Sequence, residues 1–143
     1  MSSDPRGAAA SAAVELLRIA VMSAISKSAA DWVGDARTYF LAWWIPKGAI
    51  MATLFASVPL RAVVWTVALF WMGMACILNA RRCGRTHCRY TGPYYLAMIL
   101  PVVLLASGVV AANFYVWLAL AAVVVFGGWI IWWATEQAWG KFS

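Results

Sequence analysis

The sequence predicts an all-α polytopic membrane protein, and three observations predict this fold class. First, 65% of the 143 residues are hydrophobic and only 11% are charged, which is about half the charged fraction of a typical soluble domain. Second, residues 96–112 and 116–134 are apolar almost all round, not on one face alone. Third, basic residues lie at the ends of apolar stretches and in one short segment, as they do in proteins oriented by positive charge in a membrane. A helical bundle with lipid as its solvent is therefore expected.

The membrane domain is expected at residues 39–143. Its four predicted spans lie at about 41–58, 62–80, 94–112 and 116–134. The second carries no charge and ends at two arginines, as expected of a span of about 20 residues. The first contains Pro46 and Lys47, so a three-span alternative, in which this segment only dips into the membrane, stays open. In the third, Pro101 removes the backbone hydrogen bond to Ala97 and predicts a kink.

Small residues suggest where helices approach closely. Gly48, Ala52 and Ala56 lie one helical turn apart, which suits contact with a neighbouring helix. Alanine is abundant throughout the chain, so the spacing also fits chance.

Residues 1–38 are expected to form an N-terminal tail, through about residue 13, followed by an amphipathic helix on the membrane surface. Apolar residues recur there at helical spacing, namely Val14, Leu17, Val21 and Ile25. Glu15 and Arg18 interrupt this run, and both charges would enter the hydrocarbon if the helix crossed the membrane. The pattern therefore favours a helix lying on the surface over an additional span.

The segment 81–92, between the second and third spans, is the strongest positive cluster of the chain. Its arginines are Arg81, Arg82, Arg85 and Arg89. Arginines beside spans are typical of the cytoplasmic side, where they contact anionic lipid headgroups. An anionic ligand or partner is the alternative, because guanidinium groups bind phosphate and carboxylate well. With four spans, both termini are then cytoplasmic, and lipid explains the positive charge more simply than nucleic acid.

One acidic residue is expected at the same depth as these arginines. Glu136 follows the fourth span, and an ion pair with Arg82 or Arg85 is predicted.

The same segment holds the candidate site, formed by Cys83, His87 and Cys88. Two thiols and an imidazole within this short stretch suit Cu(I), Zn(II) or Hg(II). Cys76 would add a further thiol from inside the membrane if the second helix continues to Cys83. The spacing lacks the C-x2-C pairs of structural zinc sites. A loop whose cysteines pack as small apolar groups and whose histidine hydrogen-bonds locally is the alternative.

The arginines act on such a site in two opposing ways. Their positive charge favours thiolates, which bind metals, but it also repels a cation. The sequence leaves the net effect open.

Two functional classes follow. The first is a small membrane protein that binds or handles a soft or heavy metal through this cytoplasmic Cys/His loop. The second is a non-catalytic accessory subunit of a larger membrane complex, with contacts to partner subunits and lipid through its helices and arginines. An enzyme is not expected, because the sequence contains no Gly-rich phosphate loop, no Ser/His/Asp set and no carboxylate within a predicted span.

Residues 79–93, N-A-R-R-C-G-R-T-H-C-R-Y-T-G-P, resemble a group of small bacterial inner-membrane proteins that share a C-G-R-x-H-C-x-x-T-G-P signature. The resemblance covers the second and third spans and the segment between them. It implies location in a bacterial plasma membrane, but no particular activity.

Overall fold

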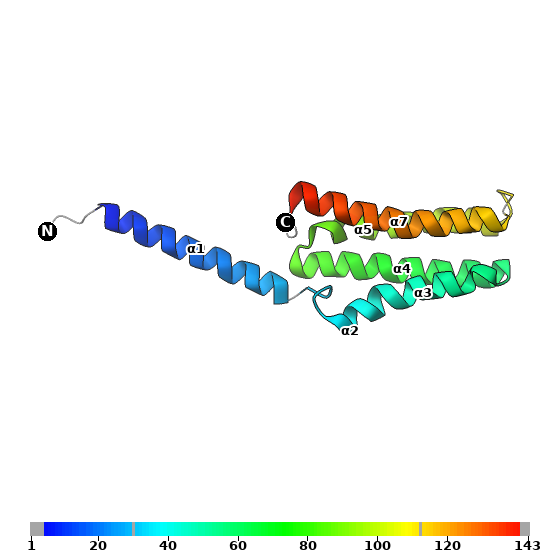
Figure 1. Ribbon diagram of the computed structural model, residues 1–143, viewed down its shortest axis with the longest axis horizontal. Helices are drawn as coiled ribbons and strands as arrows, with labels where there is room; N and C mark the ends of the chain where they lie inside the picture. The colour runs from blue at the N-terminus through cyan, green and yellow to red at the C-terminus, as the bar shows by residue number, and fades with distance from the viewer. Residues whose placement is uncertain (1–4, 30, 112, 141–143) are drawn as a thin grey trace.

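The computed structural model describes residues 5–29, 31–111 and 113–140, which are helical apart from short connections. Helix α1 (Pro5–Ala29) extends away from a bundle formed by the remaining helices (Figure 1). The bundle contains α2 (Ala36–Tyr39), the π-helix η1 (Phe40–Trp44), α3 (Ile45–Ala52), the 3-10 turn η2 (Thr53–Phe55), α4 (Val58–Cys83), α5 (Thr86–Ala97), α6 (Ile99–Ala106) and α7 (Phe114–Trp139). The predicted all-α class is confirmed for these residues.

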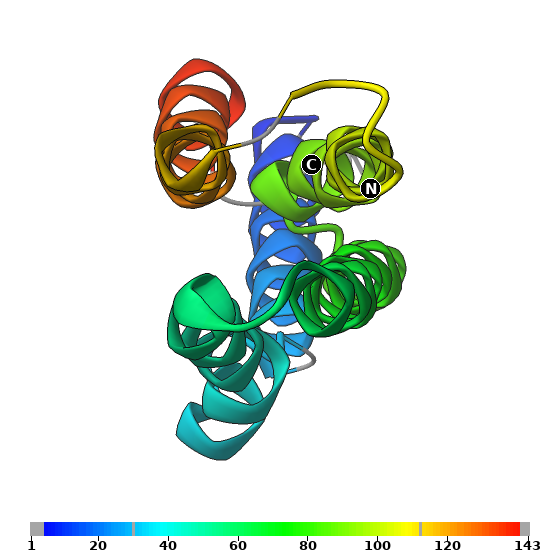
Figure 2. The same ribbon diagram turned by 90° about the vertical axis from the view of Figure 1, so that its right-hand side faces the viewer.

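Three helical segments are long and apolar enough to cross a membrane. They are α4, the α5–α6 pair spanning Thr86–Ala106, and α7. Seen along its axis, the bundle places these segments and the shorter α2–η1–α3 segment around a common centre (Figure 2). The α2–η1–α3 segment packs against α4, but it carries Arg37 and Lys47 and is not among the three candidate spans. The structure therefore supports three spans, and the fourth stays a prediction.

The helix before Pro46 is widened by one residue. Proline has no N–H to donate within a helix, and just before it the Ile45 N–H reaches back to the Phe40 carbonyl, as in a π-helix. This turn directs Trp43 into the bundle, where its side chain is buried, while Trp44 is left exposed. The π-helix therefore places an indole N–H inside the protein.

The third predicted span is broken where the sequence places the kink. Helix α5 ends at Ala97 and α6 begins at Ile99, because Pro101 provides no N–H for the Ala97 carbonyl. Helix α6 ends at Ala106, earlier than expected, and Gly108 adopts a left-handed φ of 75°. The expected end of the span at residue 112 lies outside the described residues.

Helices α4 and α5 approach each other most closely at two glycines. A Cβ atom on Gly92 would lie 2.7 Å from Ile77 Cγ1, and one on Gly73 would lie 2.8 Å from Leu96 Cδ2. The sequence placed a close approach at Gly48 instead, but a Cβ atom there would meet nothing within 4 Å. Composition alone did not distinguish the small residues that are packed from those that are not.

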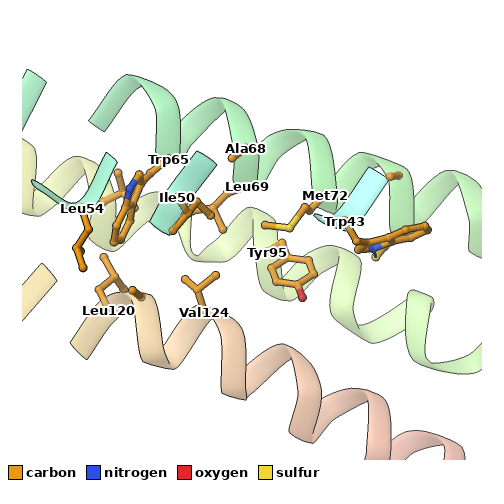
Figure 3. Close-up of a cluster of buried hydrophobic side chains, with 14 of the residues drawn as sticks. Trp43, Ile50, Leu54, Trp65, Ala68, Leu69, Met72, Tyr95, Leu120 and Val124 are labelled. Atoms are coloured by element: carbon orange, nitrogen blue, oxygen red, sulfur yellow. Dashed lines mark hydrogen bonds between the residues drawn. The ribbon is translucent and has the colours of Figure 1, made fainter. Parts of the chain in front are cut away.

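The core of the bundle is apolar and is built from successive layers of side chains (Figure 3). Its fully buried large members are Ile50, Trp65, Leu69, Met72, Val102, Trp117 and Val124. The Trp65 and Trp117 rings meet edge to face with centroids 5.2 Å apart, a favourable arrangement for aromatic pairs. Many large apolar side chains remain exposed on the outside of the bundle, which suits contact with lipid.

Helix α1 differs from the predicted surface helix. It begins at Pro5, so most of the expected tail is helical. The exposed fractions of Leu16 and Ile19, 69% and 57%, match those of Val14 and Leu17, 65% and 66%. At about 100° per residue these pairs point to opposite sides of the helix. The structure therefore does not confirm a single apolar face, and attachment to the membrane surface stays a prediction.

At the end of the bundle where α4 begins, the side chain of Arg61 is buried and caps the end of η2. Its guanidinium donates hydrogen bonds to the carbonyls of Thr53, at 3.4 Å, and Ala56, at 2.8 Å. It also lies 4.9 Å from the centroid of the Trp117 ring. Both carbonyls lie at the end of a helical segment; the Thr53 carbonyl also accepts from the Ala56 N–H at 3.0 Å, so the Ala56 carbonyl is the one that depends on Arg61.

Arg61→Met is expected to lower the free energy of unfolding by about 1–3 kcal/mol, because the Ala56 carbonyl loses its donor. Unfolding of the purified protein in detergent, followed by circular dichroism, measures this change. Arg18→Met on the exposed surface of α1 is the control and should leave stability almost unchanged. Equal stability of both variants would contradict the capping role.

Candidate functional site

The candidate site is built around a turn of two residues, not around a loop. Helix α4 continues to Cys83 and α5 begins at Thr86. Gly84 ends α4 with a left-handed φ of 69°, and its N–H donates to the Ala80 carbonyl at 2.8 Å, as in a glycine-terminated helix. The predicted loop at 81–92 is therefore almost entirely helical. The helix phase, meaning the rotation of each helix about its own axis, decides which of its side chains meet.

This phase pairs two cysteines that the sequence analysis had included in one site with Cys83. The thiols of Cys76 on α4 and Cys88 on α5 lie close enough to interact, and both residues are buried. Cys83 lies apart from the pair, because its thiol donates to the Asn79 carbonyl at 3.1 Å. The structure thus brings Cys76 together with Cys88 and His87, while Cys83 bonds to its own helix.

Hydrogen-bond donors converge on the sulfur of Cys76. The Trp43 indole N–H lies 3.3 Å from it, and the Thr91 hydroxyl lies 3.4 Å from it, although the single hydrogen of that hydroxyl has the His87 carbonyl as a nearer acceptor at 2.9 Å. Lys47 lines the same cavity as Cys76. Donors and a positive charge around a sulfur stabilise its thiolate form. Sequence analysis did not identify Trp43 or Thr91, since only the packing of α4 and α5 against η1 brings them to Cys76.

An imidazole contacts the second thiol. His87 Nε2 lies 3.3 Å from Cys88 Sγ, and His87 Nδ1 lies 2.7 Å from Glu136 Oε1. A carboxylate can only accept, so the tautomer that donates to Glu136 carries its hydrogen on Nδ1. Arg85 Nε, which lies 3.3 Å from the same Nδ1, then donates to Glu136 Oε1 at 3.1 Å. The unprotonated Nε2 then faces Cys88. A carboxylate commonly orients a metal-binding histidine in this way.

Arg85 is the centre of a buried ion-pair network. It forms ion pairs with Asp31 and with Glu136, whose Oε1 accepts from Arg85 Nε at 3.1 Å. Asn79 Nδ2 also donates to Asp31 Oδ1 at 2.9 Å. The predicted pairing of Glu136 with Arg85 is confirmed. The predicted contact of Arg85 with lipid is corrected, because its side chain is only 7% exposed and faces two carboxylates.

Asp31 was missed by the sequence analysis, because no pattern linked it to a residue 54 positions away. Burial raises the pKa of Asp31, but hydrogen bonds from Asn79, from the Val33 N–H and from Arg85 outweigh burial. The pKa of Asp31 therefore lies below its usual value. Its side chain is a carboxylate at neutral pH, and Arg85 is neutralised by two acidic partners.

The other three arginines are exposed. The Arg82 guanidinium lies 4.9 Å from the Trp32 ring centroid. Arg81 and Arg89 line a separate groove between α4 and α5. The structure thus gives the four arginines three different surroundings.

A cavity of about 200 Å³ reaches Cys76 and His87 from one side. Its walls include Trp43, Lys47, Cys76, His87, Tyr95 and Trp132. This volume exceeds that of several water molecules, each of which occupies about 30 Å³ in the liquid. The cavity therefore has room for a small ligand or ion beside Cys76.

The donor set limits what the site can hold. Within the described part of the chain, no group of three or more histidine, cysteine, aspartate or glutamate side chains is placed to bind a metal ion. The arrangement instead offers two adjacent thiols, with His87 beside one of them. Such a pair fits an ion that accepts two sulfur ligands.

Tyr94 and Tyr95 brace this region against α7. The Tyr94 hydroxyl donates to the Val123 carbonyl at 2.6 Å. The Tyr95 ring packs beside Gly128 of α7, and Figure 3 shows it below Met72 in the core. Helix α7, which carries Glu136, is thereby held against α5, which carries His87 and Cys88.

Comparisons of the chain with protein-family models, with curated proteins and with solved structures find no match.

Proposed function

We propose that this protein binds a soft metal ion through the thiol pair Cys76 and Cys88, inside its membrane bundle. The observation that carries the proposal is that two buried thiols from neighbouring helices lie close enough to interact. Thiolates are the ligands that soft ions prefer. Cu(I) and Hg(II) accept two sulfur ligands, whereas zinc sites use three or four protein ligands. The pair therefore favours Cu(I) or Hg(II) over Zn(II).

The charges around the pair support this function. The sequence left open whether the arginines would repel a cation. Because Arg85 is paired with Asp31 and Glu136, it does not place an uncompensated positive charge beside the thiols. Lys47 remains, and a Cu(I) ion between two thiolates carries one net negative charge, which Lys47 can balance. Balanced charge matters here because an unpaired charge is costly in a buried site.

Orientation is the second part of the proposal. The α4–α5 turn with exposed Arg81, Arg82 and Arg89 lies at the end of the bundle where α1 departs and α7 ends (Figure 1). Positive charge gathers on the cytoplasmic side of membrane proteins. We place this end at the cytoplasmic face of a bacterial inner membrane, so that the metal site opens near that face.

The test compares cysteine variants that differ only in position. Wild type and Cys83→Ser are expected to retain about one Cu(I) or Ag(I) ion per chain, as one thiol pair allows. Cys76→Ser combined with Cys88→Ser is expected to retain none. Elemental analysis of purified protein, reduced with a phosphine and freed of unbound metal, measures the content. Equal metal content in all three proteins, or loss in Cys83→Ser alone, contradicts the proposal.

A further inference from the structure

Beyond the thiol site, we propose that the groove between α4 and α5 binds the headgroup of one anionic phospholipid, with Arg81 and Arg89 as its phosphate ligands. The groove has a volume of about 430 Å³ and is lined by Ile77, Ala80, Arg81, Gly84, Arg85, Arg89 and Pro93. It lies on a different side of α4 and α5 from the cysteine cavity, apart from the shared Arg85. The proposal does not depend on the metal.

Arg81 and Arg89 are available to bind an anion, whereas Arg82 and Arg85 contact partners within the protein. Arg85 is held by Asp31 and Glu136, and Arg82 lies over Trp32. Arg81 and Arg89 are both exposed, and none of the ion pairs among the described residues involves them. Guanidinium groups bind phosphate through paired N–H donors. Two unpaired guanidiniums at one groove therefore form a site for a phosphate.

The rest of the groove matches the other part of a phospholipid. Below the arginines, toward the middle of α4, its floor is formed by Ile77, Ala80 and the exposed ring of Pro93. Polar groups make up the smaller part of its surface. A ligand with an anionic head and an apolar chain meets both surfaces, whereas a free phosphate meets only the arginines.

The expected depth of the groove in the membrane also indicates an anionic phospholipid as its ligand. Arg81 is in the last turn of α4 and Arg89 is near the start of α5, and both helices belong to candidate spans. Residues at the end of a span lie at the depth of lipid headgroups. Clustered basic residues there attract anionic lipid. The groove thus opens where phosphatidylglycerol would present its phosphate.

Lipid retention measured by native mass spectrometry tests this site. Protein is purified in a neutral detergent and mixed with equal amounts of phosphatidylglycerol and phosphatidylcholine. We expect wild type to retain one phosphatidylglycerol and to discriminate against phosphatidylcholine. Arg81→Gln combined with Arg89→Gln is expected to lose this preference at least tenfold. Arg82→Gln, which removes an exposed charge from the same helical turn outside the groove, is the matched control and should retain it.

A third arm separates lipid from free phosphate. Glycerol 1-phosphate, which has the headgroup phosphate without acyl chains, is added in excess and should not displace the phospholipid. Complete displacement would overturn the role of the apolar floor and leave an anion site. An equal loss of preference in Arg82→Gln and in the double variant would overturn the groove, because general surface charge would then explain binding. Circular dichroism of each variant confirms that the helices are intact.

Discussion

Arg85→Ala is expected to lower the free energy of unfolding by about 3–5 kcal/mol, the usual effect of removing one partner from a buried ion pair. The side chains of Arg85 and Asp31 are only 7% and 3% exposed. Without the guanidinium, Asp31 and Glu136 remain as two negative charges with no cation between them. The change is measured by thermal unfolding in detergent at pH 7.5. A large effect is expected because three separate segments meet at this residue.

Two comparisons identify the cause of this loss. Arg81→Ala removes an exposed arginine from the same end of the bundle and should change stability by less than about 0.5 kcal/mol. Adding Asp31→Asn and Glu136→Gln to Arg85→Ala should recover part of the loss, since the network then contains no unpaired carboxylate. Because the pKa of Asp31 is lowered in the folded protein, its stabilising effect is present at neutral pH and is lost as the pH falls through that lowered value. Equal stability of Arg81→Ala and Arg85→Ala would contradict the network.

Gly92→Leu is expected to cost about 3 kcal/mol or to prevent folding, because overpacking at a close helix contact forces the backbones apart. A Cβ atom at Gly92 would lie 2.7 Å from Ile77 Cγ1 and 3.2 Å from the Gly73 carbonyl oxygen. The remaining atoms of leucine would have no space between α4 and α5. The same displacement would separate Cys76 from Cys88, so metal binding should fall together with stability.

Gly48→Leu is the matched control for this substitution. A Cβ atom at Gly48 meets nothing within 4 Å, and leucine has a higher helix propensity than glycine. This variant should therefore be at least as stable as wild type. Yield of monodisperse protein on size-exclusion chromatography and the unfolding midpoint compare the two variants. A Gly92→Leu protein as stable as Gly48→Leu would show that the helices are not in close contact there.

The helical class and the main apolar segments could be predicted because hydrophobicity is a local property of the chain. The break before Pro101 was predictable for the same reason, since a missing N–H acts on its own helix. The pairing of Glu136 with Arg85 followed from expected depth alone. These features need no knowledge of how one helix is rotated against another.

The thiol site depends on that rotation and could not be fully predicted. A loop would have allowed Cys83, His87 and Cys88 to meet, but Gly84 ends α4 abruptly and lets α5 begin two residues later. Cys83 then bonds to the Asn79 carbonyl, while Cys76 meets Cys88. The sequence analysis named all of these candidate side chains, but the direction in which each one points depends on how its helix is rotated in the bundle. The accessory-subunit hypothesis and the bacterial membrane location stay predictions.

The two-residue turn also sets the order in which the site is assembled during synthesis. Thr91 contacts Cys76 from only 15 residues away, so the helical hairpin can insert and close as soon as α5 leaves the ribosome. Glu136 follows His87 by 49 residues and arrives only with the last helix. A nascent chain therefore holds both sulfurs before the carboxylate that orients its histidine has been translated.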